Sequence, residues 1–163
     1  MSIRQRLKTT SQLDLIAYEI NKRIYYCLEH PTMRGYWGST CGQIISRVHN
    51  FMGGAEQIRG SSVPKVLVPV VMGSGYVKHI LLSPEGQRIS YYAHRFLAQC
   101  FLEEPSPEMI QLNHINYNKI DNHIRNLEYV TPSENQRHSW MRQVIDEERN
   151  AYRRSRLKLI KKA

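Results

Sequence analysis

The stretches QLNHIN at residues 111–116 and NLEYVTPSEN at residues 126–135 decide the fold of this chain. Alternation and β-rich composition predict that His114 lies at the end of one short strand and that a second strand covers residues 127–130. Threonine, proline and glutamate at positions 131, 132 and 134 are typical of a helix start, because they supply a cap, a first-turn residue and a capping box. The predicted order is therefore strand, loop, strand, helix.

This order of elements can bring a histidine from a strand and a side chain from a helix to one point, with a divalent cation held between them. The candidate residues are Asn113, His114, Asn126 and Asn135. Hydrolysis of a phosphodiester needs a base that takes a proton from water and a cation that neutralises charge on the phosphate. A histidine with a pKa of about 6.5 can be that base. The alternative interpretation is a polar loop in which asparagines form turns and the histidine packs.

These residues, the Asn-rich loop at 117–123 and the preceding segment AHRFLA at 93–98 resemble the HNH motif of phage-type homing endonucleases. A weaker upstream resemblance, over residues 36–92, is to the small DNA-binding module often joined to such nucleases. The resemblance implies a phage-encoded, metal-dependent ββα-metal endonuclease that hydrolyses phosphodiester bonds in double-stranded DNA. A single motif copy implies one nick per monomer, and a double-strand break would need a dimer or two events. The oligomeric state stays open.

The resemblance also implies a role for each residue of the motif. His114 takes the place of the general base, and Asn126 takes the place of the residue that braces the loop and orients the histidine. Asn113 and Asn135 take the places of the ligands to Mg²⁺ or Mn²⁺. Many HNH enzymes carry aspartate where this chain has Asn113. Because hard cations favour carboxylates, we expect weak metal binding without DNA, with the DNA phosphate supplying the negative charge.

Asn113 and the basic residues outside the motif leave a second hypothesis open, namely a catalytically weak or inactive HNH-derived DNA-binding protein. An RNA-binding or ribosome-associated protein is a third. Three further histidines lie near the motif and are compatible either with a structural role or with a role at the site: His94, His123 and His138.

The chain is strongly basic, with 23 Lys plus Arg against 14 Asp plus Glu and a formal net charge of +9. Its 41% hydrophobic residues exclude a fully disordered or fibrous protein. Residues 149–163 contain several of the positive charges and no acid, which is typical of an arm that binds phosphates, although a solvated helix end is the alternative. The residues expected to contact DNA are Arg95, Arg125, Arg137, Arg142, Arg149, Arg153, Arg154, Arg156 and Lys158.

An α+β fold with four parts is predicted. These parts are an amino-terminal helix at 1–30, a small β-rich DNA-binding module at 31–92, a ββα-metal HNH unit at 93–140 and a basic helical tail at 141–163. Apolar residues at spacings of three and four predict the first helix over residues 11–29.

The middle of the chain is predicted to hold an antiparallel meander and a short helix. Three β-rich segments separated by glycine-containing turns predict the meander, at residues 65–72, 76–83 and 87–94. Pro69 should move the first of these strands to an edge or a bulge. A short buried helix is expected at 94–102.

The sequence also bears on compartment and redox state. No run of about 18 apolar residues is present, and the first residues lack the apolar centre of a secretory signal. We therefore expect a protein of the cytoplasm, that of a bacterial host if phage-encoded, with no membrane partner. Cys27, Cys41 and Cys100 are odd in number and widely spaced, so we expect reduced cysteines rather than a disulfide framework or a zinc site.

Overall fold

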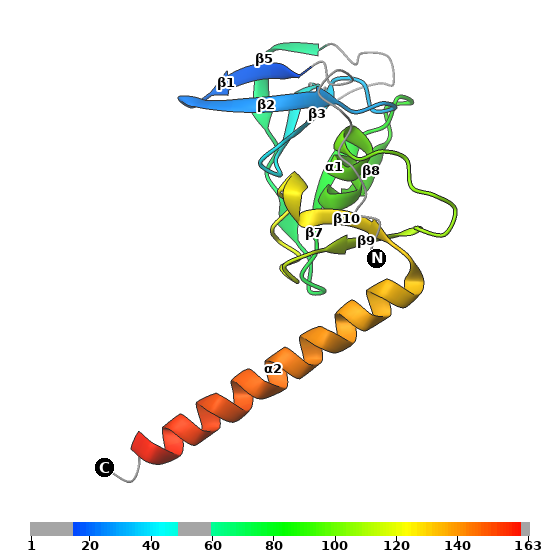
Figure 1. Ribbon diagram of the computed structural model, residues 1–163. Coiled ribbons are helices and arrows are strands. Elements are labelled where there is room, and N and C mark those ends of the chain that lie inside the picture. The colour runs from blue at the N-terminus through cyan, green and yellow to red at the C-terminus, as the bar shows by residue number, and fades with distance from the viewer. Residues whose placement is uncertain (1–14, 49–59, 161–163) are drawn as a thin grey trace.

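A computed structural model describes residues 15–48 and 60–160 of the chain and shows antiparallel sheets packed around one short helix, with a long helix projecting from the body (Figure 1). The five-stranded sheet contains, in spatial order, β1 (Ile16–Ile20), β2 (Arg23–Glu29), β3 (Tyr36–Ser39), β4 (Ile44–Val48) and β5 (Gly60–Val66). The three-stranded sheet contains β6 (Val70–Val71), β7 (Val77–Leu82) and β8 (Arg88–Tyr92). The remaining elements are α1 (Ala93–Phe101), β9 (Gln111–His114), the 3₁₀ turn η2 (Ile124–Asn126), β10 (Leu127–Val130) and α2 (Pro132–Ile160).

The prediction of an amino-terminal helix over residues 11–29 is wrong in its described part, because this part forms the β1–β2 hairpin. Asn21 and Lys22 form the turn with φ values of 52° and 63°, and two consecutive positive φ values suit the twist of a tight hairpin. Ile16 and Ile24, which a helix would have buried on one stripe, are 44% and 62% exposed. Residues 11–14, which include the predicted helix cap, lie outside the described residues.

The hairpin has a different buried face from the one that helical spacing predicted. Tyr18, Ile20 and Tyr25 pack against a small cluster that contains Cys27 and Trp37. Tyrosine and isoleucine are favoured in strands, because their branched or aromatic side chains pack well on a pleated surface. The spacings of three and four therefore arise from two short alternating strands joined by a turn.

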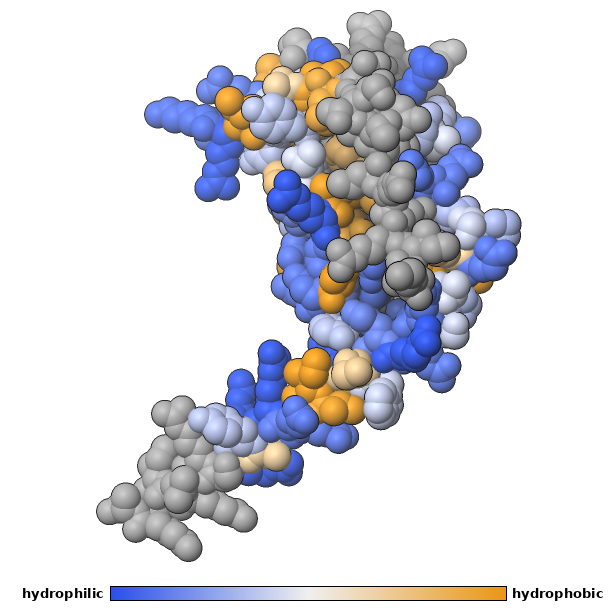
Figure 2. Space-filling view, in the orientation of Figure 1, coloured by the Kyte–Doolittle hydropathy of each residue, from blue (hydrophilic) through white to orange (hydrophobic). Residues whose placement is uncertain are grey.

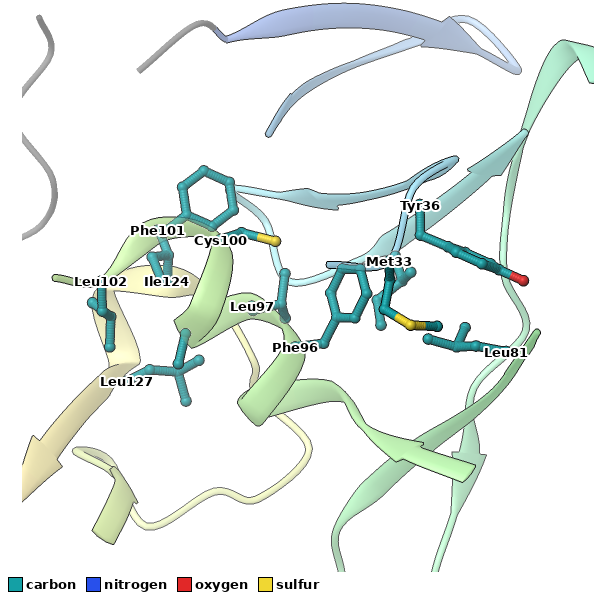
Figure 3. Packing of buried hydrophobic residues seen from close by; sticks show 12 residues of the cluster. Met33, Tyr36, Leu81, Phe96, Leu97, Cys100, Phe101, Leu102, Ile124 and Leu127 are labelled. Carbon is teal, nitrogen blue, oxygen red and sulfur yellow. The ribbon is translucent and has the colours of Figure 1, made fainter. Parts of the chain in front are cut away.

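Helix α1 lies at the centre of the main core, and the predicted helix at 94–102 is confirmed to within one residue at each end. Phe96 and Leu97 are fully buried. Figure 3 shows α1 with Met33 and Tyr36 on one side and Leu127 on the other. Burial of one such large side chain stabilises the folded state by about 1.5–3 kcal/mol. Because α1 shares one core cluster with residues of both sheets and of β10, it joins the sheets to the β9–β10 unit.

Two glycines allow close packing of backbone in this core. A Cβ at Gly38 of β3 would lie 2.9 Å from a methyl group of Leu97 in α1. A Cβ at Gly42, in the turn between β3 and β4, would lie 2.7 Å from the backbone carbonyl carbon of Asn122. The five-stranded sheet is thus packed directly against the loop that connects β9 with β10.

The predicted meander is present as the β6–β7–β8 sheet, but its first segment is divided. Residues up to Val66 belong to β5 in the larger sheet, and Pro69 lies between β5 and β6. Proline has no N–H for a sheet ladder, which accounts for the break at this position.

Helix α2 begins where the capping box predicted. The Thr131 hydroxyl accepts a hydrogen bond from the Glu134 N–H at 3.2 Å, and the Glu134 carboxylate accepts one from the Thr131 N–H at 3.0 Å. The helix then continues without a break from the motif into the basic end of the chain. The α+β class is therefore confirmed, with a carboxy-terminal helix and, in the part of the chain that the structure describes, without the predicted amino-terminal one.

The coloured part of α2 that faces the viewer in Figure 2 is mostly hydrophilic, with an apolar patch partway along its length. A helix repeats every 3.6 residues, so the spacings of 7, 7 and 4 place Asn135, Arg142, Arg149 and Arg153 on one face. We call this the site face of α2. Trp140, which is 62% exposed, lies on the opposite face.

Two predictions concern the state of the cysteines and the presence of membrane-spanning helices. All three cysteines are free, and two of them are buried in the core. No helix in the described ranges is long and apolar enough to cross a membrane.

The contact between Gly42 and the β9–β10 loop can be tested with a matched pair of variants. Gly42 and Gly75 have φ values of 91° and 83°, so alanine at either position incurs strain of about 1–2 kcal/mol. At Gly75 the new methyl group meets only the side chain of Lys119 at 3.5 Å, whereas at Gly42 it meets the backbone of Asn122 at 2.7 Å, which should add about 1–3 kcal/mol of overpacking. We expect urea denaturation to show a larger loss of stability for Gly42→Ala than for Gly75→Ala, and equal losses would contradict this contact.

Candidate active site

A small polar hollow of about 180 Å³ brings together three of the four central residues of the motif. Asn113 and His114 come from the end of β9, and Asn135 comes from the first turns of α2. The capping box and the β9–β10 pairing fix the position of α2 relative to the strand. Side chains separated by more than 20 residues in sequence therefore line one hollow.

His114 is held in one defined tautomer. Its Nε2 lies 3.1 Å from Oδ1 of Asn122, whose own Nδ2 donates to the carbonyl of Ile120 at 3.1 Å. Since the Asn122 oxygen can only accept, the Nε2 of His114 carries the ring proton. The basic nitrogen of the neutral ring is then Nδ1.

Burial lowers the pKa of His114 below its usual value of 6.5. The bond to Asn122 and the charge of Asp121 act in the opposite direction, and the nearby charge of Lys119 acts in the same direction as burial. The lowered pKa favours the neutral ring at neutral pH, which is the form that can accept a proton.

Asn122 is the functional residue that sequence reasoning missed. This residue is 5% exposed. It lies in the Asn-rich loop at residues 117–123, in which the sequence analysis assigns it no role. Its backbone packs against Gly42, and the next residue but one, Ile124, donates its N–H to Thr40 at 3.2 Å. In sequence, one asparagine of a turn-rich loop looks like the others, so no local signal distinguishes it.

Asn126 braces the loop. Its Nδ2 donates to the carbonyl of Asp121 at 2.7 Å, and its Oδ1 accepts from the N–H of Asn116 at 2.9 Å. Its backbone carbonyl accepts from Ile115 at 2.9 Å. These bonds close the loop between β9 and β10, whereas the hydrogen bond to the His114 ring comes from Asn122.

The two amides expected to hold a metal are each bound through nitrogen to a side chain of the β9–β10 sheet. Nδ2 of Asn113 donates to Oε1 of Glu128 at 3.2 Å. Nδ2 of Asn135 donates to Oε1 of Gln111 at 2.6 Å. Among the described residues, no group of three His, Cys, Asp or Glu side chains is arranged to hold a metal ion. The oxygens that Asn113 and Asn135 can offer a cation at this hollow are amide carbonyls.

His138 lines the same hollow, one helical turn beyond Asn135. Its Nε2 donates to the carbonyl of Ile115 at 3.2 Å, and its ring stacks on Tyr117 with centroids 3.9 Å apart. Arg142 donates to the carbonyl of Tyr117 at 3.0 Å. These contacts tie α2 to the β9–β10 loop.

His94 lies behind the hollow, in α1. Its ring centroid is 5.3 Å from that of His114 and 5.0 Å from that of Tyr76. Burial, followed by the nearby charges of His114 and Arg95, lowers the pKa of His94 to about 3. The residue is therefore neutral and packed within an aromatic cluster.

The central hollow adjoins two others, and together they form what we call the site groove. One of about 380 Å³ contains His94 and Arg95 and shares Tyr76 and Asn135 with the centre. One of about 490 Å³ lies between the β9–β10 loop and α2 and shares Tyr117, Lys119 and Arg142 with the centre. The groove is lined by the cations Arg95, Lys119, Arg142 and Arg149 and by the acid Asp146.

The structure does not bring every predicted residue to this groove. Arg125 is exposed in η2, and the Nδ1 of His123 accepts a hydrogen bond from the N–H of Arg125 at 3.2 Å. Arg137 and Arg154 lie on α2 outside its site face. The side chains of Arg156 and Lys158 lie outside the described part of the helix.

Comparison with a family model identifies the segment that carries the hollow. The HNH endonuclease model matches residues 91–137, which run from the end of β8 through α1, β9 and β10 into α2. Residues 91–137 are therefore similar in sequence to HNH endonucleases.

Two curated relatives match the chain over parts of their length. The SPbeta prophage-derived protein YosQ of Bacillus subtilis (strain 168), whose name assigns it to the HNH homing endonucleases, is 46% identical over 50 residues, or 31% of this chain and 28% of that protein. L247 of Acanthamoeba polyphaga mimivirus, named as an uncharacterized HNH endonuclease, is 40% identical over 70 residues, or 42% of this chain and 18% of that protein. The matched segments thus span less than a third of either relative.

One solved structure shares the fold. The structure titled "DNA binding and cleavage by the HNH homing endonuclease I-HmuI" superposes with a TM-score of 0.55 at 22% identity. The match covers 72% of this chain and 59% of that one. Similarity therefore extends beyond residues 91–137 at the level of the fold.

The state of the His114 ring can be measured without any assay of activity. We expect nuclear magnetic resonance of ¹⁵N-labelled histidine to show an Nε2–H tautomer that titrates below pH 6.5, because burial lowers the pKa. Asn122→Ala removes a bond that raises the pKa and fixes the tautomer, so its midpoint should move lower and both tautomers should appear. A midpoint at or above 6.5 in the unsubstituted protein would contradict the geometry described above.

Proposed function

We propose that this protein, whose residues 91–137 match the HNH endonuclease family model, is a divalent-metal-dependent DNA endonuclease that nicks one strand of a duplex. The observation that carries the proposal is the position of a neutral, tautomer-fixed His114 in one hollow with Asn113 and Asn135. The prophage origin of one relative supports a phage-borne gene with a homing role.

The donor set fits a hard divalent cation such as Mg²⁺ or Mn²⁺. The carbonyl oxygens of Asn113 and Asn135 are suitable ligands, and neither accepts a hydrogen bond from a described residue. A bound cation would neutralise charge that develops on the phosphate and on the leaving oxygen. Because both ligands are neutral, the DNA phosphate has to supply the negative charge.

The chain's own residues bind and orient the reacting groups. His114, neutral at physiological pH, takes a proton from water at Nδ1, while Asn122 holds Nε2 and so keeps the ring in this orientation. Asn126 maintains the loop that carries Asn122. Lys119 and Arg142 flank the hollow and are placed to bind the phosphates on either side of the cut.

The site face of α2 extends this surface along the DNA. From Asn135 to Arg153 the helix rises by about 27 Å, which corresponds to about eight base pairs of duplex. Contacts of this kind bind backbone phosphates without reading sequence. Any sequence preference would then come from the β-rich module at residues 31–92, which we assign to DNA binding.

The second candidate function is that of an HNH-derived DNA-binding protein without catalysis. The replacement of a carboxylate by Asn113 favours it, because an amide binds Mg²⁺ less strongly. Assays of binding and of cleavage on the same samples distinguish the two functions.

Cleavage can be tested with supercoiled plasmid. We expect conversion to the open circular form in the presence of Mg²⁺ or Mn²⁺ and none with a chelator. Loss of the general base should reduce the rate for His114→Ala by about 10²-fold or more, with DNA binding retained in a gel-shift assay. Tight binding without metal-dependent nicking, or equal nicking by His114→Ala, would reject catalysis in favour of the second candidate.

Because only one face of α2 continues from the hollow, removal of two arginines from the site face should weaken DNA binding more than removal of two arginines from other faces. The double variant Arg149→Gln/Arg153→Gln removes two cations from the site face, and Arg137→Gln/Arg154→Gln removes two cations from other faces. We expect the first to weaken DNA binding and to reduce the slope of log K against log salt by about 2, because each phosphate contact contributes about 1. The second should change the slope less. Equal effects would mean that the arm acts only through its total charge.

A further inference from the structure

We infer that Glu128 and Gln111 are positioning residues that turn the amide groups of Asn113 and Asn135 so that their carbonyl oxygens are available to the divalent cation. This inference rests on the proposed function and explains how a site with two neutral ligands can bind a cation at all. It gives a role to two side chains of the β9–β10 sheet outside the four central residues of the HNH motif.

The argument is strongest at Asn113. Glu128 of β10 is its direct cross-strand partner, so the two side chains leave the sheet side by side on the same face. An amide group can rotate by half a turn and present either nitrogen or oxygen, whereas a carboxylate only accepts hydrogen bonds. The 3.2 Å bond from Nδ2 to Oε1 of Glu128 therefore requires that Oδ1 face away from Glu128.

Asn135 is also bound through its nitrogen, but its partner Gln111 is an amide, which can donate as well as accept. Gln111 lies two residues before Asn113 on β9, and alternate residues of a strand share one face. Its Oε1 accepts from Nδ2 of Asn135 at 2.6 Å, which leaves Oδ1 of Asn135 free of described hydrogen-bond donors. One short strand pair thus anchors both amides through nitrogen.

Orientation matters more for an amide ligand than for a carboxylate. Both oxygens of a carboxylate bind a cation, but an amide turned the wrong way presents an NH₂ group that donates hydrogen bonds and has no oxygen to offer. With two amides, one of the four combined orientations presents both oxygens. Hydrogen-bonded partners that fix ligand orientation are worth about 10- to 100-fold in metal affinity or activity.

The hydrogen bond and the charge of Glu128 can be separated by two substitutions. Glu128→Ala removes both, while Glu128→Gln removes the charge and the restriction to accepting, but keeps an oxygen that can accept from Asn113 as Oε1 of Gln111 accepts from Asn135. The readout is Mn²⁺ binding to the protein on a short DNA duplex, measured from the loss of the free Mn²⁺ signal in electron paramagnetic resonance, with the duplex alone subtracted. Glu108→Ala, in the exposed loop before β9, is the control for loss of an acid.

We expect Glu128→Ala to weaken Mn²⁺ binding by about 10-fold or more and Glu128→Gln to restore most of it. Gln111→Ala should weaken it similarly, with Gln136→Ala on the exposed surface of α2 as its control. Circular dichroism melting identifies any variant that fails to fold. If a substitution at Glu128 prevents folding, Gln111→Ala provides the test, and if Gln111→Ala prevents folding, the substitutions at Glu128 provide it.

Two results would overturn the inference. Mn²⁺ binding unchanged in both Glu128→Ala and Gln111→Ala would mean that neither partner positions its amide. Equal losses in Glu128→Ala and Glu128→Gln would mean that charge, not orientation, is what Glu128 provides. Failure of the proposed function has a different signature, because the unsubstituted protein itself would then neither bind Mn²⁺ on DNA nor nick plasmid.

Discussion

The arrangement of the site depends on the hydrogen bonds by which Asn126 closes the loop between β9 and β10. Its side chain binds the carbonyl of Asp121 and the N–H of Asn116 at the same time. This double contact fixes the loop in the shape that places Asn122 beside the His114 ring. The packing of Gly42 against the backbone of Asn122 supports the same loop from the five-stranded sheet. Residues that do not line the hollow therefore determine which nitrogen of His114 is basic.

The second constraint is electrostatic. The two amide ligands bring no charge, and cations line much of the groove around them. Such a site is better suited to receive a phosphate and a divalent cation together than to hold a cation alone. In the proposed function, binding of DNA and binding of metal are coupled, because the phosphate supplies the charge that the two amides lack. This coupling would restrict hydrolysis to complexes in which the strand lies in the groove.

Sequence and structure agree where the signal is local. The capping box at Thr131, the buried helix around Phe96 and the strand at residues 127–130 each depend on neighbouring residues, and all are present. The amino-terminal helix failed because two short strands with apolar residues on both faces imitate spacings of three and four. The decisive residues there are Asn21 and Lys22, whose positive φ values become visible only in three dimensions.

The sequence by itself determined the order of elements around His114, the chemical character of the candidate ligands and the excess of positive charge. These properties are carried by residue type and spacing along the chain, so they need no coordinates. Only the tertiary structure decided that Asn122 binds the histidine ring, that Glu128 and Gln111 bind the nitrogens of Asn113 and Asn135, and which arginines of α2 share a face with Asn135. Hydrogen-bond partners across strands and loops depend on register and packing, and a linear pattern of polar residues contains neither.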